Sequence, residues 1–484
     1  NGRAGSGKST ILYYLFADYV NLYLELQGQH ESTKAPLLLS CSHELRRQAE
    51  RTVANLIKSN PRWRREDGQA AEAPSDCFQE FQTFLRALLP EDERTIRFDP
   101  AKYIDFARFR RMWQSHFEKN KRIRSLGPDL SWHVIRTFIK GTNSEEYLEP
   151  EDYEHLPRKQ KSVSQTSFTA VYEGVWEGWY CDLCEQDGYW DDQDLARYVF
   201  ANDLAQPIYP AVFCDEAQDF TRVELDLIFR LCLFTNRKLR HEDVNRVPFA
   251  FAGDPFQTLN PTGFRWDAIQ ALFHDRLVDT LGENLYKQID LNYQELTLNY
   301  RSTKNIVRLC NLIQAYRAAV FDISTLRPQQ SWQTEAASPM PVWFDRNETT
   351  HWKQLQHEKD VTIIVPCMLN EEQGFVQKDE YLKSVVQTDD LGTPVNVLSP
   401  ARAKGLEFGR VVLYGFADKE PEKLLASLEK SDQDDDSLLP FEYFVNQLYV
   451  AASRPKRRLF IIDSQKGRDS FWKIANDEAL QQKL

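Results

Sequence analysis

The 484-residue sequence contains no apolar run that approaches the about 20 residues needed by a membrane-spanning helix. Its mean hydropathy is −0.56, and no secretory signal is visible in its first residues. The sequence therefore excludes an integral membrane protein, and we expect no membrane among its partners.

Cysteine is also scarce, and its positions do not indicate a disulfide framework. The eight cysteines are mostly scattered, which is typical of reduced thiols rather than of paired disulfides. Cys181 and Cys184 form a CxxC pair, but no second Cys or His pair stands at zinc-site spacing. We therefore expect a cytoplasmic protein, or a nuclear one in a eukaryote, without a structural zinc.

Positive charge is in deficit, because 60 Lys and Arg residues face 72 Asp and Glu residues and give a net charge of −12. This balance argues against a general nucleic-acid coat protein, although a local basic groove would still bind a strand. Hydrophobic residues make up 42% of the chain, which is enough for real cores. The length predicts two to four domains.

What is present begins with the first ten residues, NGRAGSGKST, which form a phosphate-loop pattern. In such a loop, glycines turn backbone N–H groups toward a triphosphate, the lysine reaches the β- and γ-phosphates, and the serine hydroxyl ligates Mg²⁺. The run ILYYLFADYV then predicts a helix whose positive end faces the same phosphates. We therefore expect ATP and Mg²⁺ as cofactors, held by Gly2, Gly5, Ser6, Gly7, Lys8, Ser9 and Thr10.

The loop has no strand before it, although a phosphate loop normally follows a buried strand. Asn1 already lies inside the loop, and no initiator methionine is present. We therefore expect a core strand upstream, to pair its backbone groups with the sheet, and a fused or associated upstream domain as a partner.

A strand–helix alternation typical of a parallel α/β sheet follows the loop. Residues 36–42 predict a buried strand, and residues 43–59 predict a helix with Leu45, Ala49, Val53 and Leu56 on one face. The alternation returns with strands at 211–220 and 247–259.

Polar side chains stand at the ends of these later strands, where α/β sheets bind their ligands. Asp215 is placed to hold Mg²⁺, and Glu216 to orient and deprotonate an attacking water. Gln257 follows the next strand and is placed to sense a γ-phosphate. Phe264 and Trp266 come shortly afterwards and are either stacking residues or core residues.

Residues 60–205 lack the alternation and predict a mainly helical insertion. Within it, residues 106–124 interleave aromatic residues with basic ones, among them Arg110 and Arg111. This pattern fits a nucleic-acid backbone with stacked bases. An ordinary amphipathic helix with a solvated face is the more frequent explanation.

Further strands and helices are expected in the last 190 or so residues, at 296–310, 361–366, 395–416 and 441–463. Tyr300 and Arg301 follow the first of these strands, and Gly405 and Glu407 lie in a turn. Arg454 stands at the end of the last helix, before a basic turn RPKRR and a closing strand.

Six segments in order resemble the motifs of UvrD/Rep-type superfamily 1 helicases: AGSGKST, VFCDEAQDF, GDPFQTL, LNYRS, AKGLEF and QLYVAASRPKRRL. The wording is most similar to the UvrD-like ATPases of large multidomain proteins, in which segments like WHVIRTFIKG and GFRW also occur. The resemblance covers most of the chain and is weakest from 60 to 200.

The resemblance implies an α/β fold with two RecA-like P-loop NTPase domains and ATP between them. Residues 1–59 and 206–290 would form the first domain, 60–205 its insertion, and 291–484 the second domain. Arg301 and Arg454 match arginines that reach the γ-phosphate, Tyr300 an aromatic on the adenine, and Gly405 and Glu407 a motif near the nucleotide. Ser42, Phe264, Trp266 and Ser399 fall in or beside motifs that contact single strands.

The chain also departs from the family pattern. Ser399 and Ala401 stand where the family usually has Thr and His, and Ser453 where it usually has Thr. Only residues 367–394 separate two expected strands where family members carry a large accessory domain. We therefore expect little or no accessory domain, which argues against processive duplex unwinding.

Together these patterns predict a nucleic-acid-dependent ATPase that translocates on single-stranded nucleic acid, with DNA favoured over RNA. Two other classes stay open: an ATP-gated regulatory module of a larger protein, and a catalytically dead scaffold. ATPase assays with and without single-stranded DNA separate the three.

Overall fold

The computed structural model describes residues 2–27, 34–63, 73–236, 248–264, 266, 269–272, 274–275, 296–320, 327–333, 338–348, 360–389, 394–418 and 435–476. The chain forms two compact units. Unit 1 holds Lys8–Pro255 and Asn260–Glu295, and unit 2 holds Gly2–Gly7, Phe256–Leu259 and Leu296–Leu484. The division between the units therefore falls inside the phosphate loop, after Gly7.

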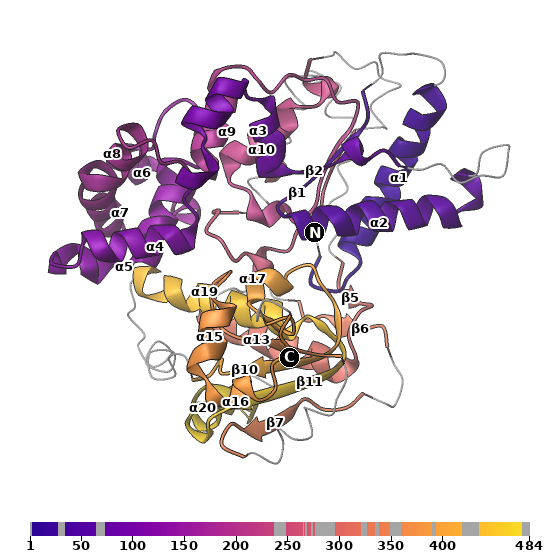
Figure 1. The fold of residues 1–484 in the computed structure, drawn as a ribbon, viewed down its shortest axis with the longest axis vertical. Coiled ribbons are helices and arrows are strands. Elements are labelled where there is room, and N and C mark those ends of the chain that lie inside the picture. The colour runs from indigo at the N-terminus through magenta and orange to yellow at the C-terminus, as the bar shows by residue number, and fades with distance from the viewer. Residues whose placement is uncertain are drawn as a thin grey trace. The chain divides into compact units, whose positions relative to one another are not determined.

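Unit 1 is built on four parallel strands in the order β2-β1-β3-β4, of which Figure 1 labels β1 and β2. Their bounds are β1 Leu37–Ser40, β2 Phe78–Glu80, β3 Val212–Cys214 and β4 Phe249–Phe251. β1, β3 and β4 lie in the runs expected to be strands. β2 lies inside the stretch expected to be an insertion, because three residues are too few to show a strand period in the sequence.

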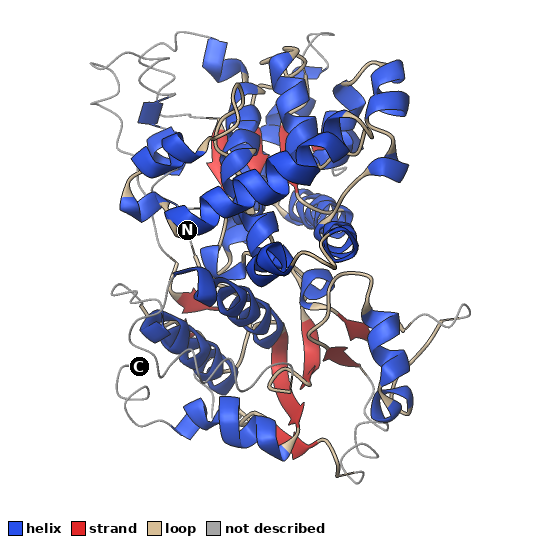
Figure 2. Ribbon diagram, turned by 90° about the vertical axis from the view of Figure 1, so that its left-hand side faces the viewer, coloured by secondary structure: helices blue, strands red, loops and turns tan. Residues whose placement is uncertain are grey.

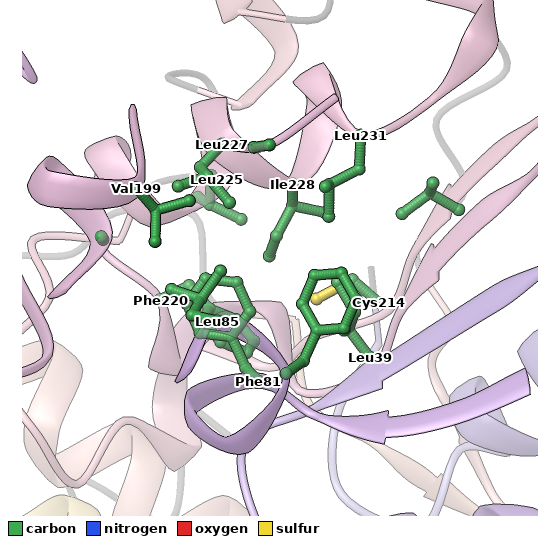
Figure 3. Packing of buried hydrophobic residues seen from close by; sticks show 14 of the residues in the cluster. Leu39, Phe81, Leu85, Val199, Cys214, Phe220, Leu225, Leu227, Ile228 and Leu231 are labelled. Carbon is green, nitrogen blue, oxygen red and sulfur yellow. The ribbon is translucent and has the colours of Figure 1, made fainter. Parts of the chain in front are cut away.

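The alternation of side chains along β1 places helices on both faces of this sheet. Leu38 packs with α1 and α2, whereas Leu37 and Leu39 pack with α3, α9 and α10. Figure 1 shows these two groups on opposite sides of β1 and β2, and Figure 3 shows side chains of α10 facing those of β1 and β3. The bounds are α1 Lys8–Gln27, α2 His43–Ser59, α3 Phe81–Leu88, α9 Asp192–Ala201 and α10 Arg222–Arg230.

The helix α2 has the bounds expected from its sequence, and its buried stripe runs through Leu45, Ala49, Val53 and Ile57. Ile57 thus takes the fully buried place that the sequence pattern assigned to Leu56, which packs only partly against the same core. Leu56 and Ile57 lie three and four residues after Val53, and both spacings fall on the same face of a helix, so periodicity alone separates them poorly.

Further helices fill the chain from β2 to β3: α4 Phe106–His116, α5 Lys121–His133, α6 Pro150–His155, α7 Gln165–Val171 and α8 Cys181–Glu185, with π-helical stretches at Val134–Ile139 and Tyr172–Tyr180. Lys140 is fully buried, and its Nζ lies 2.6 Å from carboxylate oxygens of both Asp191 and Asp194. Removing one partner of such a buried pair costs about 3–5 kcal/mol. This cluster therefore fastens the Val134–Ile139 stretch to the first turn of α9.

Unit 2 has a second parallel sheet, in the order β7-β11-β10-β8-β9. Ile364, Val411 and Leu413 pack with α13 and α19, whereas Ile363 and Val412 pack with residues of α15 and α16. Figure 2 shows helices to both sides of these strands. The strand bounds are β7 Val342–Asp345, β8 Val361–Ile364, β9 Val397–Leu398, β10 Phe408–Tyr414 and β11 Pro455–Asp463.

Unit 2 also contains a small second ladder and several helices. A two-stranded parallel ladder joins β5 Leu298–Asn299 to β6 Gln330–Ser331. The helices are α13 Lys304–Val320, α15 Glu372–Lys378, α16 Glu380–Lys383, α17 Pro400–Ala403, α19 Asp435–Ala452 and α20 Gln465–Ser470. In the described ranges, no helix is both long and apolar enough to cross a membrane.

The expected basic turn RPKRR is wrong, because Pro455 opens the strand β11 and the three basic residues after it belong to that strand. Their side chains are exposed, whereas the strand is buried from Leu459 onward. Proline is tolerated at the first residue of a strand. Only the three basic residues after the buried Pro455 are exposed, and this polar stretch resembles a turn in the sequence.

Candidate active site

The first part of the candidate site lies in unit 1, where α1 begins and β3 ends. Lys8 and Ser9 are the first residues of α1, and Asp215 directly follows β3. Ser9 Oγ donates to Asp215 Oδ1 over 3.1 Å, and the Tyr13 hydroxyl, one helical turn later, donates to Oδ2 over 2.6 Å. The predicted magnesium ligands Ser9 and Asp215 are therefore brought together.

The surroundings of Asp215 favour a bound cation. Burial and the charge of Glu216 raise the pKa of Asp215 to about 6, while hydrogen bonds from Tyr13 and Ser9 oppose that rise. Hydroxyl and carboxylate oxygens are ligands that Mg²⁺ accepts, and with a nucleotide it needs only one or two from the protein. No cluster of three or more metal-binding side chains exists in the described ranges. The pair thus fits a magnesium ion shared with phosphates.

Glu216 has a strained backbone. Its φ of 54° and ψ of 44° are left-handed, which costs a non-glycine residue about 1–2 kcal/mol. Its own N–H donates to Asp215 Oδ1 over 3.0 Å, and the next N–H, of Ala217, donates to the Ala252 carbonyl over 2.8 Å. Such strain gathers at functional sites, so this turn after β3 is part of the candidate site.

The second part of the candidate site lies in unit 2 and begins with the phosphate loop. Gly5 and Gly7 have φ of +72° and +85°, and a Cβ on Gly5 would lie 2.8 Å from Asn299 Nδ2. Asn299 Nδ2 also donates to the Ala4 carbonyl over 2.9 Å. The buried Ser6 hydroxyl has no hydrogen-bond partner in the described structure. A loop fixed by side chains, with an unsatisfied hydroxyl, fits a phosphate ligand.

Arg454 and Gln257 meet inside unit 2. Arg454 is 1% exposed, and its Nη2 donates to Gln257 Oε1 over 2.6 Å. Its Nε donates to the Val450 carbonyl over 2.8 Å, and Lys404 Nζ donates to the Gln257 carbonyl over 2.7 Å. The predicted phosphate sensor and one predicted arginine are therefore direct partners.

Arg301 and Glu407 form an ion pair in unit 2. Arg301 Nε lies 2.7 Å from Glu407 Oε1, and Lys456 Nζ lies 2.8 Å from Glu407 Oε2. Burial acts to raise the pKa of Glu407, but Arg301 and Lys456 outweigh it, so the pKa falls below its ordinary value. Glu407 is therefore charged and forms an ion pair with Arg301. It lies two residues after Gly405, where φ is +77°.

Tyr300 presents an exposed ring, as an adenine-stacking residue requires. It is 51% exposed, and its ring centroid lies 5.4 Å from that of Trp332, which is 62% exposed. Trp332 was not predicted from the sequence, because it lies outside every recognised motif.

The predicted nucleic-acid residues are mostly engaged within the fold. Ser42 and Ser399 are helix caps, and Ser399 is fully buried with its hydroxyl donating to Glu372 Oε1 over 2.7 Å. Phe264 and Trp266 pack partly against the core of unit 1, with ring centroids 5.1 Å apart. Because Ser399 is buried, its side chain is not accessible to a nucleic-acid strand in this structure. Phe264 and Trp266 each pack one side of the ring against the core.

The run 106–124 separates its aromatic residues from its basic ones. Phe109, Trp113 and Phe117 are buried, and the ring of Phe109 lies 4.8 Å from that of Trp132. Arg111 is exposed and Arg110 is half-buried. These aromatics form the core of the helical stretch, as the more frequent explanation, an amphipathic helix with a solvated face, predicts. The exposed cations alone could contact phosphates.

Several residues at the site were missed by the sequence reading. Tyr13 lies four residues after Ser9, a spacing that places both on one helix face. Gln218 lies inside the motif DEAQD, and its Nε2 donates to Glu216 Oε2. Asn299 precedes the LNYRS tyrosine and fixes the phosphate loop. Tyr13 had a spacing signal, and Gln218 and Asn299 both lie inside recognised motifs.

The chain is similar to parts of longer known proteins. No family model matches the chain. Over 371 residues the chain is 26% identical to the human TPR and ankyrin repeat-containing protein 1, a match that covers 74% of this chain and 12% of that protein. The solved PRRSV helicase matches with 13% identity and a TM-score of 0.22, over 52% of this chain and 34% of that one. A TM-score of this size carries no argument.

Proposed function

We propose that the chain is a nucleic-acid-dependent ATPase that translocates on single-stranded DNA. The observation that carries the proposal is the convergence of Ser9 and Asp215 at the end of β3, beside the strained Glu216. Carboxyl ends of parallel strands are where α/β sheets bind ligands. These residues combine a magnesium-binding pair with a general base, which is what nucleotide hydrolysis requires.

Each group then has one role. Bound Mg²⁺–ATP supplies the cleavable phosphate bond and its counter-ion. The N–H groups of the phosphate loop and Lys8 bind the phosphates, and Glu216 orients a water and takes its proton. Arg301 and Arg454 supply positive charge as the bond breaks, and Gln257 reads the γ-phosphate. We further propose that the two helix-covered parallel sheets are RecA-like domains.

The ATP-gated regulatory module is the second candidate, and specific observations favour it. Ser399 is buried, and the aromatic residues of the run 106–124 are internal. The chain corresponds to 12% of the length of a relative whose name describes repeats. A module of this kind would hydrolyse ATP with the same residues and move a neighbouring part of the protein.

Phosphate release by the purified chain, with and without a single-stranded oligonucleotide, tests the proposal. Hydrolysis stimulated by single-stranded DNA supports the translocating ATPase. Hydrolysis that no DNA or RNA oligonucleotide changes supports the gated module. If wild-type phosphate release is no faster than that of Lys8→Ala, both proposals fail.

A further inference from the structure

The buried amide of Gln218 contacts the proposed general base, and it leads to an inference that rests on the proposed ATP hydrolysis. Gln218 is 0% exposed and stands two residues after Glu216. Its Nε2 donates to Glu216 Oε2, and its Oε1 accepts from the N–H of Asp254 over 2.9 Å. We infer that Gln218 is a positioning residue, which holds the Glu216 carboxylate in the orientation needed for hydrolysis.

The two partners allow only one orientation of the amide. The carboxylate of Glu216 accepts hydrogen bonds, and the backbone N–H of Asp254 donates one. A flipped amide would place its oxygen against the carboxylate and its NH₂ group against the N–H, so both bonds would be lost. Since the oxygen and nitrogen of the Gln218 amide are both buried, neither could form a hydrogen bond with water instead. Glutamine, and not glutamate, is therefore required at this position.

The surroundings leave Gln218 no alternative position. Its backbone carbonyl accepts a hydrogen bond from Thr262 Oγ1 over 2.8 Å. A Cβ added to Gly253 would lie 2.7 Å from Gln218 Oε1 and 3.4 Å from Gln218 N. Gly253 therefore leaves the space that the amide fills. Held in this way, the Gln218 amide gives the Glu216 carboxylate a buried hydrogen-bond donor that fixes its direction.

Two substitutions disturb this contact in different ways. Gln218→Met keeps the length of the side chain and removes the amide. Gly253→Ala keeps the amide and pushes it away from its present position. Gln193→Met is the matched control, because Gln193 is also 0% exposed in unit 1, but its side chain bonds Arg136. Thermal unfolding of all three reports any loss of stability separately from turnover.

We expect Gln218→Met to lower kcat by about 10- to 100-fold, because small misplacements of a catalytic group have effects of this size. ATP affinity should stay within about threefold, since the amide contacts no phosphate-binding residue. Gly253→Ala should lower kcat by a smaller factor. Gln193→Met should leave kcat unchanged in the folded protein.

A double substitution separates positioning from a general structural role. In a Glu216→Gln background, Gln218→Met should lower the single-turnover rate no further, because the base it positions is already gone. An equal additional loss in that background would overturn the inference. A Gln218→Met variant with the same kcat as the wild type would also overturn the inference. That result would leave the proposed function standing, because the wild-type protein would still hydrolyse ATP. Absence of turnover in the wild type would overturn both.

Discussion

The two parts of the candidate site hold their charges in opposite ways. In unit 1 the carboxylate of Asp215 is held by the neutral hydroxyls of Ser9 and Tyr13. In unit 2, Arg301 is held by the charged Glu407, and Arg454 by four hydrogen-bond acceptors. Under the proposed function, Asp215 would exchange only neutral donors for a cation, whereas Arg301 and Arg454 would have to exchange acceptors within unit 2 for a phosphate.

Arg454→Ala should break the unit 2 part most strongly. We expect kcat to fall by about 10³-fold, the lower end of the range for such arginines, with a smaller loss of ATP affinity, because the charge it meets grows in the transition state. Steady-state kinetics check this, with Arg457→Ala, an exposed residue of β11, as the control. Thermal unfolding is needed as well, since Arg454 is buried. An unchanged kcat in a folded variant would remove Arg454 from the mechanism.

Acid pH should weaken the unit 1 part. The pKa of Asp215 is raised to about 6, so below that pH the carboxyl is protonated in the nucleotide-free protein and must lose its proton to bind Mg²⁺. Magnesium-dependent ATP affinity should therefore fall about tenfold per pH unit below 6. Equilibrium binding from pH 5 to pH 8 checks this.

The same raised pKa has an opposite effect on the nucleotide-free fold. Because the folded state holds the proton more tightly than the unfolded state, stability from Asp215 is present at low pH and is lost as the pH rises from about 4 through 6. Asp215→Asn should abolish both pH dependences. A flat binding profile in the wild type would contradict the account.

Phe264 and Trp266 offer a smaller test, of the nucleic-acid path. Replacing both by Ala should weaken binding of a single-stranded oligonucleotide by about 1–3 kcal/mol per stacked base at every salt concentration. Neutralising Arg110, Arg111, Lys121 and Arg122 should instead flatten the salt dependence. Binding isotherms at several salt concentrations measure both. If the ring variant binds like wild type but unfolds at a lower temperature, the rings are only core residues.

Glu407→Gln should have the smallest effect and sharpen the comparison. It removes the charge that holds Arg301, and such partly exposed pairs are worth about 0.2–1 kcal/mol. If partner exchange limits the reaction, turnover should rise by up to about fivefold. The turnover rate at saturating ATP measures this effect. Lys456→Gln is the control, because it removes the other ion pair of Glu407 and leaves that with Arg301. A fall in turnover would mean that Glu407 itself acts on the nucleotide.

The sequence predicted the positions of most strands and long helices, because buried parallel strands and amphipathic helices have strong periods. α2 runs from His43 to Ser59, as expected. Short or partly exposed strands were missed or misassigned, as with β2 and the basic first half of β11.

The pairing of site residues was predictable only within a motif. The neighbours Asp215 and Glu216 were found together, and so was their relation to the phosphate-loop serine. The ion pair of Arg301 with Glu407 spans 106 residues of sequence, so no spacing could reveal it. The burial of the aromatics in the run 106–124 also depends on residues far along the chain, such as Trp179, whose ring packs against that of Phe109.

The most direct test of the central claim compares Glu216→Gln with the wild type in ATP binding and in ATP turnover. The substitution keeps the shape of the side chain and removes the base, so binding should be retained while turnover falls by about 10²–10⁴-fold. Lys8→Ala should weaken both. Near-wild-type turnover in Glu216→Gln would contradict the assignment of this strained glutamate as the catalytic base.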